Sequence, residues 1–211
     1  MNETVRATVT KAEREEPKGG DMVADDVLER LREGAVRFRL GKSQTDYSKT
    51  QREAVAEEPT PSVVLLGCSD SRVPVEAVFD VGIGDAWVVR TAGHVLSDAG
   101  LASVRFGVEM WGIPLVVVVG HEDCLAVRAA LQGDTPKWLA AITDYIETDP
   151  AALGASGEDE ATVLNGAVDA HVKASVAALE TYLKGLALPI SNPPHVVGCT
   201  YHPATGEVHW L

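Results

Sequence analysis

The sequence has few cysteines, few basic residues relative to acidic ones, and no long apolar run. Its three cysteines cannot all pair within one chain, and a chain of 211 residues does not need disulfides to fold. We therefore expect free thiols and a reducing cytoplasm. No apolar run approaches the roughly 20 residues that cross a bilayer, so we expect no membrane span. Residues 1–20 lack the apolar stretch of a secretory leader, so we expect no secretion signal there.

The shortage of basic residues bears on the partner class. Lysine and arginine number 18 against 31 acidic residues, which gives a net charge of −13. Nucleic acid is a poor partner for such a chain, because neutralising phosphates requires a basic surface. The apolar fraction of 45% and the charged fraction of 23% are those of an ordinary globular protein.

The organisation of the chain predicts one domain with an N-terminal arm. Residues 1–20 hold four acidic and four basic residues with almost no apolar periodicity, so we expect a disordered arm there and a single domain over 21–211. Apolar residues recur at mostly helical spacing over Asp21–Leu40, and Gly41 follows as an end signal. This segment is predicted to be an amphipathic helix.

Four apolar, valine-rich runs predict a parallel sheet. Runs that are apolar at consecutive positions are typical of strands covered on both faces, as parallel strands are. They are Ser62–Gly67, Ala86–Arg90, Pro114–Gly120 and His195–Cys199.

Helical periodicity between these runs predicts an α/β fold. Helices are expected at Ser97–Trp111, from Ala126 to Leu131, and onward to Leu186 with a break around Pro150–Gly157. Glu207–Leu211 follows a Pro-Ala-Thr-Gly turn and is predicted to return as an antiparallel edge strand. The sequence therefore predicts a mostly parallel central sheet flanked by helices.

Cysteine and histidine side chains follow two of the predicted strands. Cys68 directly follows the first run, and His121 and Cys124 follow the third. Carboxyl ends of strands are where open α/β sheets collect catalytic groups, so the three side chains are expected at one edge. Two thiolates and an imidazole suit Zn²⁺ and leave a fourth position open. The alternative interpretation is two buried core thiols and a satisfied histidine.

Asp70 and Arg72 follow Cys68 closely and are predicted to lie within reach of the same metal. Arginine holds a neighbouring aspartate ionised and fixes its orientation. Such a carboxylate could accept a proton from a zinc-bound water or hydroxide and orient it, or it could fill the fourth zinc position. The remaining alternative is a structural ion pair at the end of a strand.

Three sequence strings together closely resemble the β-class carbonic anhydrases. They are C-S-D-S-R-V at 68–73, V-V-R-T-A-G-H at 88–94 and G-H-E-D-C at 120–124, with G-I-G-D at 82–85 before the second. The resemblance extends from the helix near Glu33 to about Leu131 and, weakly, to the C-terminal strands.

The resemblance implies a fold and a zinc site. It implies a mostly parallel sheet with flanking helices, Cys68, His121 and Cys124 as zinc ligands, and Asp70 with Arg72 as a dyad beside the fourth position.

The resemblance also implies an activity and an assembly. The activity would be reversible hydration of CO2 to bicarbonate by a zinc-bound hydroxide that the dyad orients. It further implies an obligate homodimer, often assembled further, in which an N-terminal helix such as Asp21–Leu40 reaches over the partner.

Three positions depart from the family pattern. Leu125 replaces the glycine usual after the last ligand cysteine, Pro59 aligns where many members have glutamine, and Arg105 aligns with a common glutamate. Leu125 and Pro59 lie where access to the pocket is decided. Two other functions therefore stay open: a zinc hydrolase of carbonyl sulfide or carbon disulfide, and a non-catalytic zinc-bearing homologue that binds a partner or senses bicarbonate.

The remaining reactive or large side chains are predicted to have ordinary roles. Cys199 is expected to be a core thiol, and Trp87 and Trp111 are expected in the core. The histidines outside the ligand set are predicted to be surface or interface residues: His94, His195, His202 and His209.

Overall fold

The computed structural model of this chain describes residues 23–148, 159–186 and 193–211. The arm expected over residues 1–20 and the break expected around Pro150–Gly157 both lie outside these residues. Among the residues described, no helix combines the length and the apolar character that a bilayer span requires.

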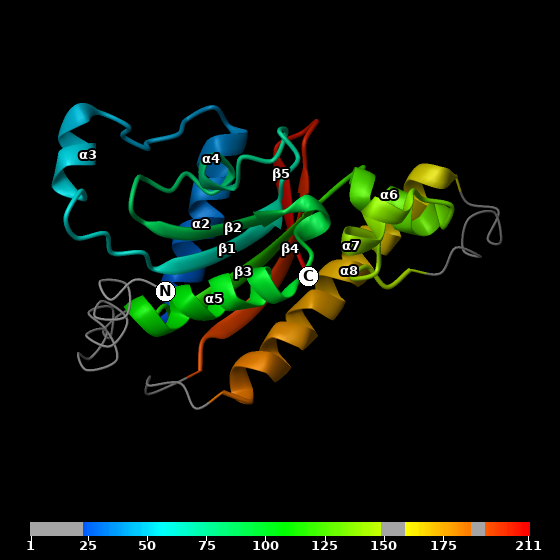
Figure 1. The fold of residues 1–211 in the computed structure, drawn as a ribbon. Helices are drawn as coiled ribbons and strands as arrows, with labels where there is room; N and C mark the ends of the chain where they lie inside the picture. Colours follow the sequence, from blue (N-terminus) through cyan, green and yellow to red (C-terminus); the bar gives the residue numbers. More distant parts are fainter. Residues whose placement is uncertain (1–22, 149–158, 187–192) are drawn as a thin grey trace.

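The described strands form one five-stranded sheet (Figure 1). Its order is β2-β1-β3-β4-β5, with β1 to β4 parallel and β5 antiparallel to β4. This confirms the predicted parallel sheet and its antiparallel edge. The strands are β1 (Val63–Cys68), β2 (Ala86–Thr91), β3 (Leu115–His121), β4 (His195–His202) and β5 (Glu207–Trp210).

Helices cover both faces of the sheet (Figure 1). One apolar cluster joins α2 (Ala24–Arg39) and α4 (Val75–Val78) to one face. The other joins α5 (Asp98–Trp111) and α8 (Glu160–Lys184) to the opposite face. Both clusters draw on the same strands, which is why β1 and β3 are buried along their whole length.

The predicted helices exist, with boundaries set by local signals. Gly41, at a φ of 64°, lies just beyond the end of α2. The hydroxyl of Ser97 accepts a hydrogen bond from the Gly100 amide and caps α5. The carboxylate of Asp159 accepts one from the Thr162 amide and caps α8.

The short helices were only partly predicted. The predicted helix start at Ala126 corresponds to α6 (Leu125–Gln132). The α3 helix (Lys49–Ala54) lies in a polar stretch for which no helix was predicted, and the Ser48 hydroxyl caps it. The others are η1 (Ala92–His94), η2 (Lys137–Leu139) and α7 (Ala140–Thr143).

A glycine brings α8 close to the carboxyl end of β3. A Cβ atom built on Gly120 would lie 2.5 Å from Cγ2 of Val172, so any side chain there would push the helix away. The long helix therefore passes directly behind the residue pair Gly120–His121.

The strand order brings two strand ends together. The chain passes from β1 to β2 on one side, whereas β3, on the other side of β1, leads to β4. The carboxyl ends of β1 and β3 are therefore neighbours where the connections diverge, which is the usual position of functional groups in open α/β sheets.

Candidate metal centre

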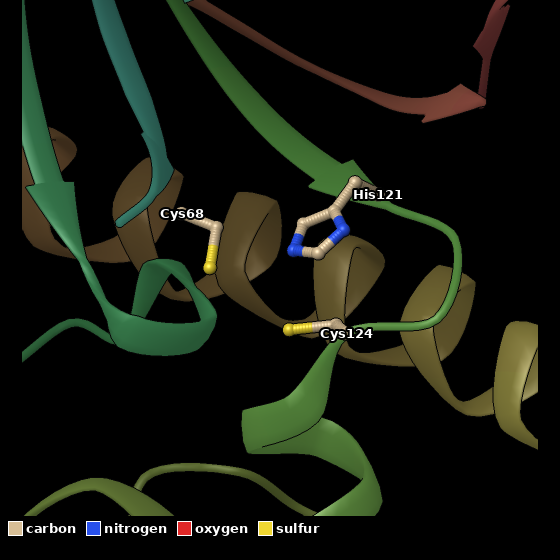
Figure 2. A group of neighbouring side chains, drawn as sticks. All are labelled: Cys68, His121 and Cys124. Carbon is tan, nitrogen blue, oxygen red and sulfur yellow. The ribbon is translucent and has the colours of Figure 1, made fainter. Parts of the chain in front are cut away.

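The three side chains predicted as zinc ligands converge at this edge of the sheet. The Sγ atoms of Cys68 and Cys124 and a ring nitrogen of His121 lie within 4.8 Å of one another. Figure 2 shows the imidazole directed toward the two sulfurs, with the ribbon of α8 behind them. All three side chains are buried. Sequence reasoning predicted this convergence correctly.

Local structure explains how His121 and Cys124 come to face one point. His121 ends β3, and Cys124 is the N-cap of α6 three residues later. Between them Asp123 adopts a φ of 55°, a left-handed conformation that aspartate tolerates better than most residues. This tight turn reverses the chain and brings the cysteine beneath the histidine.

The His121 imidazole is prepared to donate a lone pair. Its Nδ1 lies 2.9 Å from the carbonyl oxygen of Glu122, which can only accept, so Nδ1 carries the proton. Its Nε2 is buried and has no hydrogen-bond partner among the described residues. A buried nitrogen without a partner is costly, and a metal ion at that atom would satisfy it.

The two sulfurs favour a shared negative charge. The Cys68 sulfur accepts hydrogen bonds from the backbone amides of Gly93 at 3.2 Å and Asp70 at 3.4 Å. The pKa of Cys68 falls below its ordinary value, chiefly because the Cys124 thiol donates to its thiolate, with His121 and the amides adding to the effect against burial. The pKa of Cys124 rises correspondingly, because its proton is held by Cys68 and its site is buried. Thiolate character is what a soft or borderline metal requires.

Asp70 and Arg72 form a bidentate pair beside the cluster. The Arg72 guanidinium donates through Nε to Oδ1 at 3.0 Å and through a terminal nitrogen to Oδ2 at 2.7 Å, and its backbone amide donates to Oδ1 at 2.9 Å. These side-chain bonds are the main reason that the pKa of Asp70 falls to about 2, and His121 contributes through space. The carboxylate is therefore ionised across the physiological range.

Two further residues hold this pair, and sequence reasoning gave them no role. Arg90 on β2 donates to the carbonyls of Cys68 at 2.8 Å and Asp70 at 2.7 Å, and so fixes the backbone between them. The Asp123 carbonyl accepts from Arg72 at 3.3 Å, which ties the end of β1 to the turn after β3. The only sequence signal for Arg90 was its place in the V-V-R-T-A-G-H string.

The residues that depart from the family pattern lie at the surface. Leu125 is 66% exposed at the start of α6, and Pro59 is exposed. Arg105 forms an ion pair with Glu109 one turn along α5, at 2.7 Å.

The structure contradicts the prediction for one of the other histidines and gives the burial of the remaining three. His94 was predicted to be a surface or interface residue, and this is wrong: it is fully buried, because the η1 turn folds it inward against α8. His195 and His209 are exposed, and His202 is half-buried with Nδ1 2.9 Å from the Glu122 carboxylate.

The remaining side chains fall close to expectation. Cys199 is a core thiol, as predicted, in a different apolar cluster from Cys68 and Cys124. Trp87 and Trp111 are only partly buried; they pack against the core with ring centroids 4.9 Å apart and planes tilted by 35°.

Comparison with known proteins identifies the family. The family model described as "Carbonic anhydrase" matches residues 63–208. A carbonic anhydrase of Mycolicibacterium smegmatis is 36% identical over 190 residues, which cover 84% of this chain and 88% of that protein. Carbonic anhydrase 2 of Mycobacterium tuberculosis is 35% identical over 175 residues, covering 81% and 84% respectively.

Solved structures agree on the fold. The β-carbonic anhydrase CafA of Aspergillus fumigatus superimposes with a TM-score of 0.66 at 20% identity and covers 89% of both chains. A tetrameric β-carbonic anhydrase of Sordaria macrospora gives 0.65 at 18% identity, covering 88% of this chain and 97% of the other.

Proposed function

Since the chain belongs to the β-carbonic anhydrase family, we propose that Cys68, His121 and Cys124 bind one Zn²⁺ and that Asp70, held by Arg72, orients the water that attacks CO2. Reversible hydration of CO2 is the general activity of this family. The observation that carries the proposal is the convergence of three buried ligand atoms, one of which is a nitrogen without a partner among the described residues.

The donor set fits zinc better than harder cations. Two sulfurs and one imidazole suit a borderline-soft ion, whereas Mg²⁺ and Ca²⁺ require oxygen ligands. Three protein ligands leave room for a fourth that is not protein, as catalytic zinc sites do. When bound there, zinc supplies Lewis acidity, which makes water a nucleophile near neutral pH.

The carboxylate of Asp70 is proposed to accept a hydrogen bond from the attacking water. An ionised carboxylate has about four acceptor positions, and Arg72 occupies two on Oδ1 and one on Oδ2. Oδ2 therefore has room for one more donor. Because the pKa of Asp70 is about 2, the group accepts and does not donate at neutral pH, so it selects a species that carries an O–H.

Arg72 is proposed to keep that carboxylate in place. Its two side-chain bonds to Asp70 fix the plane of the carboxylate, and its bond to the Asp123 carbonyl fixes the guanidinium. Without Arg72, Asp70 would be free to rotate toward the metal and occupy the position needed by water.

Association into a homodimer or larger assembly is part of the proposal. Val36 and Leu40 on or beside α2 expose 47% and 56% of their surface, and Val23 exposes 57%. Val36 and Leu40 lie one helical turn apart, and neighbouring exposed apolar side chains favour a protein partner. The structure from Sordaria macrospora is described as tetrameric, which supports an assembly here.

The decisive test measures hydration and metal in the same preparations. Stopped-flow CO2 hydration across pH, with zinc content by elemental analysis, should show about one zinc per chain and turnover that disappears on chelation. Wild-type protein with one zinc and no hydration at any pH would favour the non-catalytic homologue. Turnover of carbonyl sulfide or carbon disulfide without CO2 hydration would favour the hydrolase.

A further inference from the structure

One buried histidine of α8 has no role in the proposed mechanism. His171 exposes 3% of its surface and lies on the helix face that packs against the sheet, among Leu164, Val168 and Val172. Burying a polar ring in such a face is unfavourable unless the ring makes a hydrogen bond. Its Nε2 lies 3.0 Å from the carbonyl oxygen of Gly93. Because a carbonyl only accepts, His171 donates through Nε2.

The residue that accepts this bond also touches a metal ligand. The amide of Gly93 donates to the Cys68 sulfur at 3.2 Å. One glycine thus carries the His171 contact on its carbonyl and the thiolate contact on its amide. The chain of contacts runs from α8 through the η1 turn to the end of β1.

The turn receives a restraint from a distant part of the chain. Gly93 has a φ of 66°, and a Cβ atom there would lie 2.9 Å from the Ala126 Cβ, so glycine is required. Glycine has the widest conformational freedom of any residue, so nothing in its own side chain fixes its two peptide planes. A donor on the rigid helix α8 supplies that restraint.

A second ring fixes the donor. The imidazole of His94 stacks on that of His171 with centroids 4.4 Å apart and planes 28° apart. Both are buried, and burial lowers the pKa of each below its ordinary value, so both rings are neutral at physiological pH. The stacked pair is therefore uncharged, and it lies next to the turn.

We propose that His171 is a positioning residue for the ligand thiolate of Cys68, acting through Gly93. This inference rests on the proposed function, since it requires Cys68 to be a metal ligand. An amide directed at a thiolate stabilises its charge and sets its orientation. Loss of the His171 bond releases the Gly93 carbonyl, allows the turn to relax, and weakens one of the two amide contacts to the sulfur.

Two substitutions separate the hydrogen bond from the packing. In His171→Gln the side-chain amide nitrogen can reach the position of Nε2 and still donate, whereas in His171→Leu the volume stays similar but no donor remains. Leu179→Ala is the control: it removes a buried side chain from the same helix, in a cluster without any ligand cysteine. It lowers stability without touching the turn.

The experiment measures zinc affinity by chelator competition, together with the thiolate-to-metal absorption of the Co²⁺-substituted protein and the melting temperature. Replacing a direct hydrogen-bond partner of a metal ligand typically weakens metal binding by about 10- to 100-fold. His171 acts through Gly93, one hydrogen bond further away, so in His171→Leu we expect a loss at the lower end, about 10-fold, with an altered Co²⁺ spectrum. His171→Gln should stay within roughly threefold of wild type, because the donor is kept. Leu179→Ala should melt earlier with unchanged affinity and spectrum.

The outcomes distinguish this inference from the proposed function. A folded His171→Leu variant with wild-type affinity and spectrum would overturn the inference alone, as would equal losses in the Gln and Leu variants. A wild-type chain that binds no zinc would overturn the proposed function and this inference with it.

Discussion

Two groups of buried polar side chains differ in how their hydrogen bonds are satisfied. One is the ligand cluster of Cys68, His121 and Cys124, and the other is the carboxylate of Asp80. The Asp80 side chain is 1% exposed and accepts from the Arg37 guanidinium at 2.6 Å, from the hydroxyl and amide of Thr45, and from the amide of Gln44. In the ligand cluster, by contrast, His121 Nε2 has no partner among the described residues.

This difference distinguishes a buried polar group that stabilises the fold from one that can bind a ligand. Burial acts first on Asp80 and raises its pKa, but donors from Thr45, Arg37 and the two amides outweigh it and hold the pKa at about 2. Such a group stabilises the fold and has no acceptor capacity left for a ligand. In the ligand cluster the unpartnered nitrogen of His121 lies beside two cysteine sulfurs, so a metal ion bound there would complete the group.

The largest effect is expected from removal of a ligand thiol. Cys68→Ser and Cys124→Ser should each reduce zinc from about one per chain to near zero and abolish hydration, since a three-ligand site that loses a thiolate keeps little affinity. Cys199→Ala is the matched control, because Cys199 is an equally buried thiol outside the cluster. Undiminished zinc in both serine variants would contradict the ligand assignment.

A large effect on rate without loss of metal is expected at Asp70. Asp70→Asn should retain zinc and lose roughly 100-fold in CO2 hydration, because an amide is a poorer acceptor and can present a donor instead. Stopped-flow rates per bound zinc measure this. Full activity of the zinc-loaded variant would show that the Asp70–Arg72 pair is only structural.

The opposite pattern is expected at Asp80. Asp80→Asn should lower the free energy of unfolding by about 2 kcal/mol through loss of charged hydrogen bonds, with zinc content and turnover per folded chain unchanged. Asparagine is the suitable replacement because position 80 has a φ of 50°, which asparagine tolerates. Glu53→Gln, in an exposed pair with Lys49, should change stability by less than about 0.5 kcal/mol. Denaturant unfolding compares the two.

Low pH should weaken the hydrogen bonds that the Asp80 carboxylate accepts. The pKa of Asp80 is about 2 in the folded chain and 3.8 ordinarily, so its stabilisation is complete above about pH 4 and is lost as pH falls toward 2. Urea midpoints measured between pH 5 and 2 should therefore fall less steeply for Asp80→Asn than for wild type. Parallel curves for the two proteins would contradict the role of this carboxylate.

The smallest effect is expected at the exposed apolar residues of α2. Val36→Glu should weaken self-association by roughly tenfold, since it places a charge in an apolar contact, while zinc binding stays unchanged. Glu33→Gln on the same helix is the control, as Glu33 is exposed and already polar. Light scattering at several protein concentrations measures the association of both variants. A monomeric wild type would contradict the proposed assembly.

Much of the fold and the centre of the site could be predicted from local patterns. Continuous valine-rich runs identified all four parallel strands. In β1 and β3 the reason is that both faces are covered, so consecutive positions are all buried. The turn from His121 to Cys124 could be assigned from its spacing. Cys68 was placed beside it because strand ends of a parallel sheet share an edge.

The residues that position the site could not be predicted from local sequence patterns, because their partners are distant in the sequence. Arg90 and Cys68 are 22 residues apart, and His171 and Gly93 are 78 apart. His94 was misplaced at the surface because polar residues are usually exposed, and no local signal shows that a helix far along the chain supplies a stacking ring.

The sequence by itself determined the strands, the order of the ligand residues and the chemistry of their side chains. These features depend on hydrophobic periodicity and residue type, which are visible within a short segment. Only the tertiary structure decided which buried polar groups are satisfied. The acceptor positions of Asp80 are filled because α2 and the segment at Gln44 and Thr45 reach it. In the part of the chain that the structure describes, His121 Nε2 has no partner, because the turn after β3 supplies an acceptor to Nδ1 alone. Satisfaction of a buried group depends on partners that arrive from distant parts of the chain, and packing alone sets their positions.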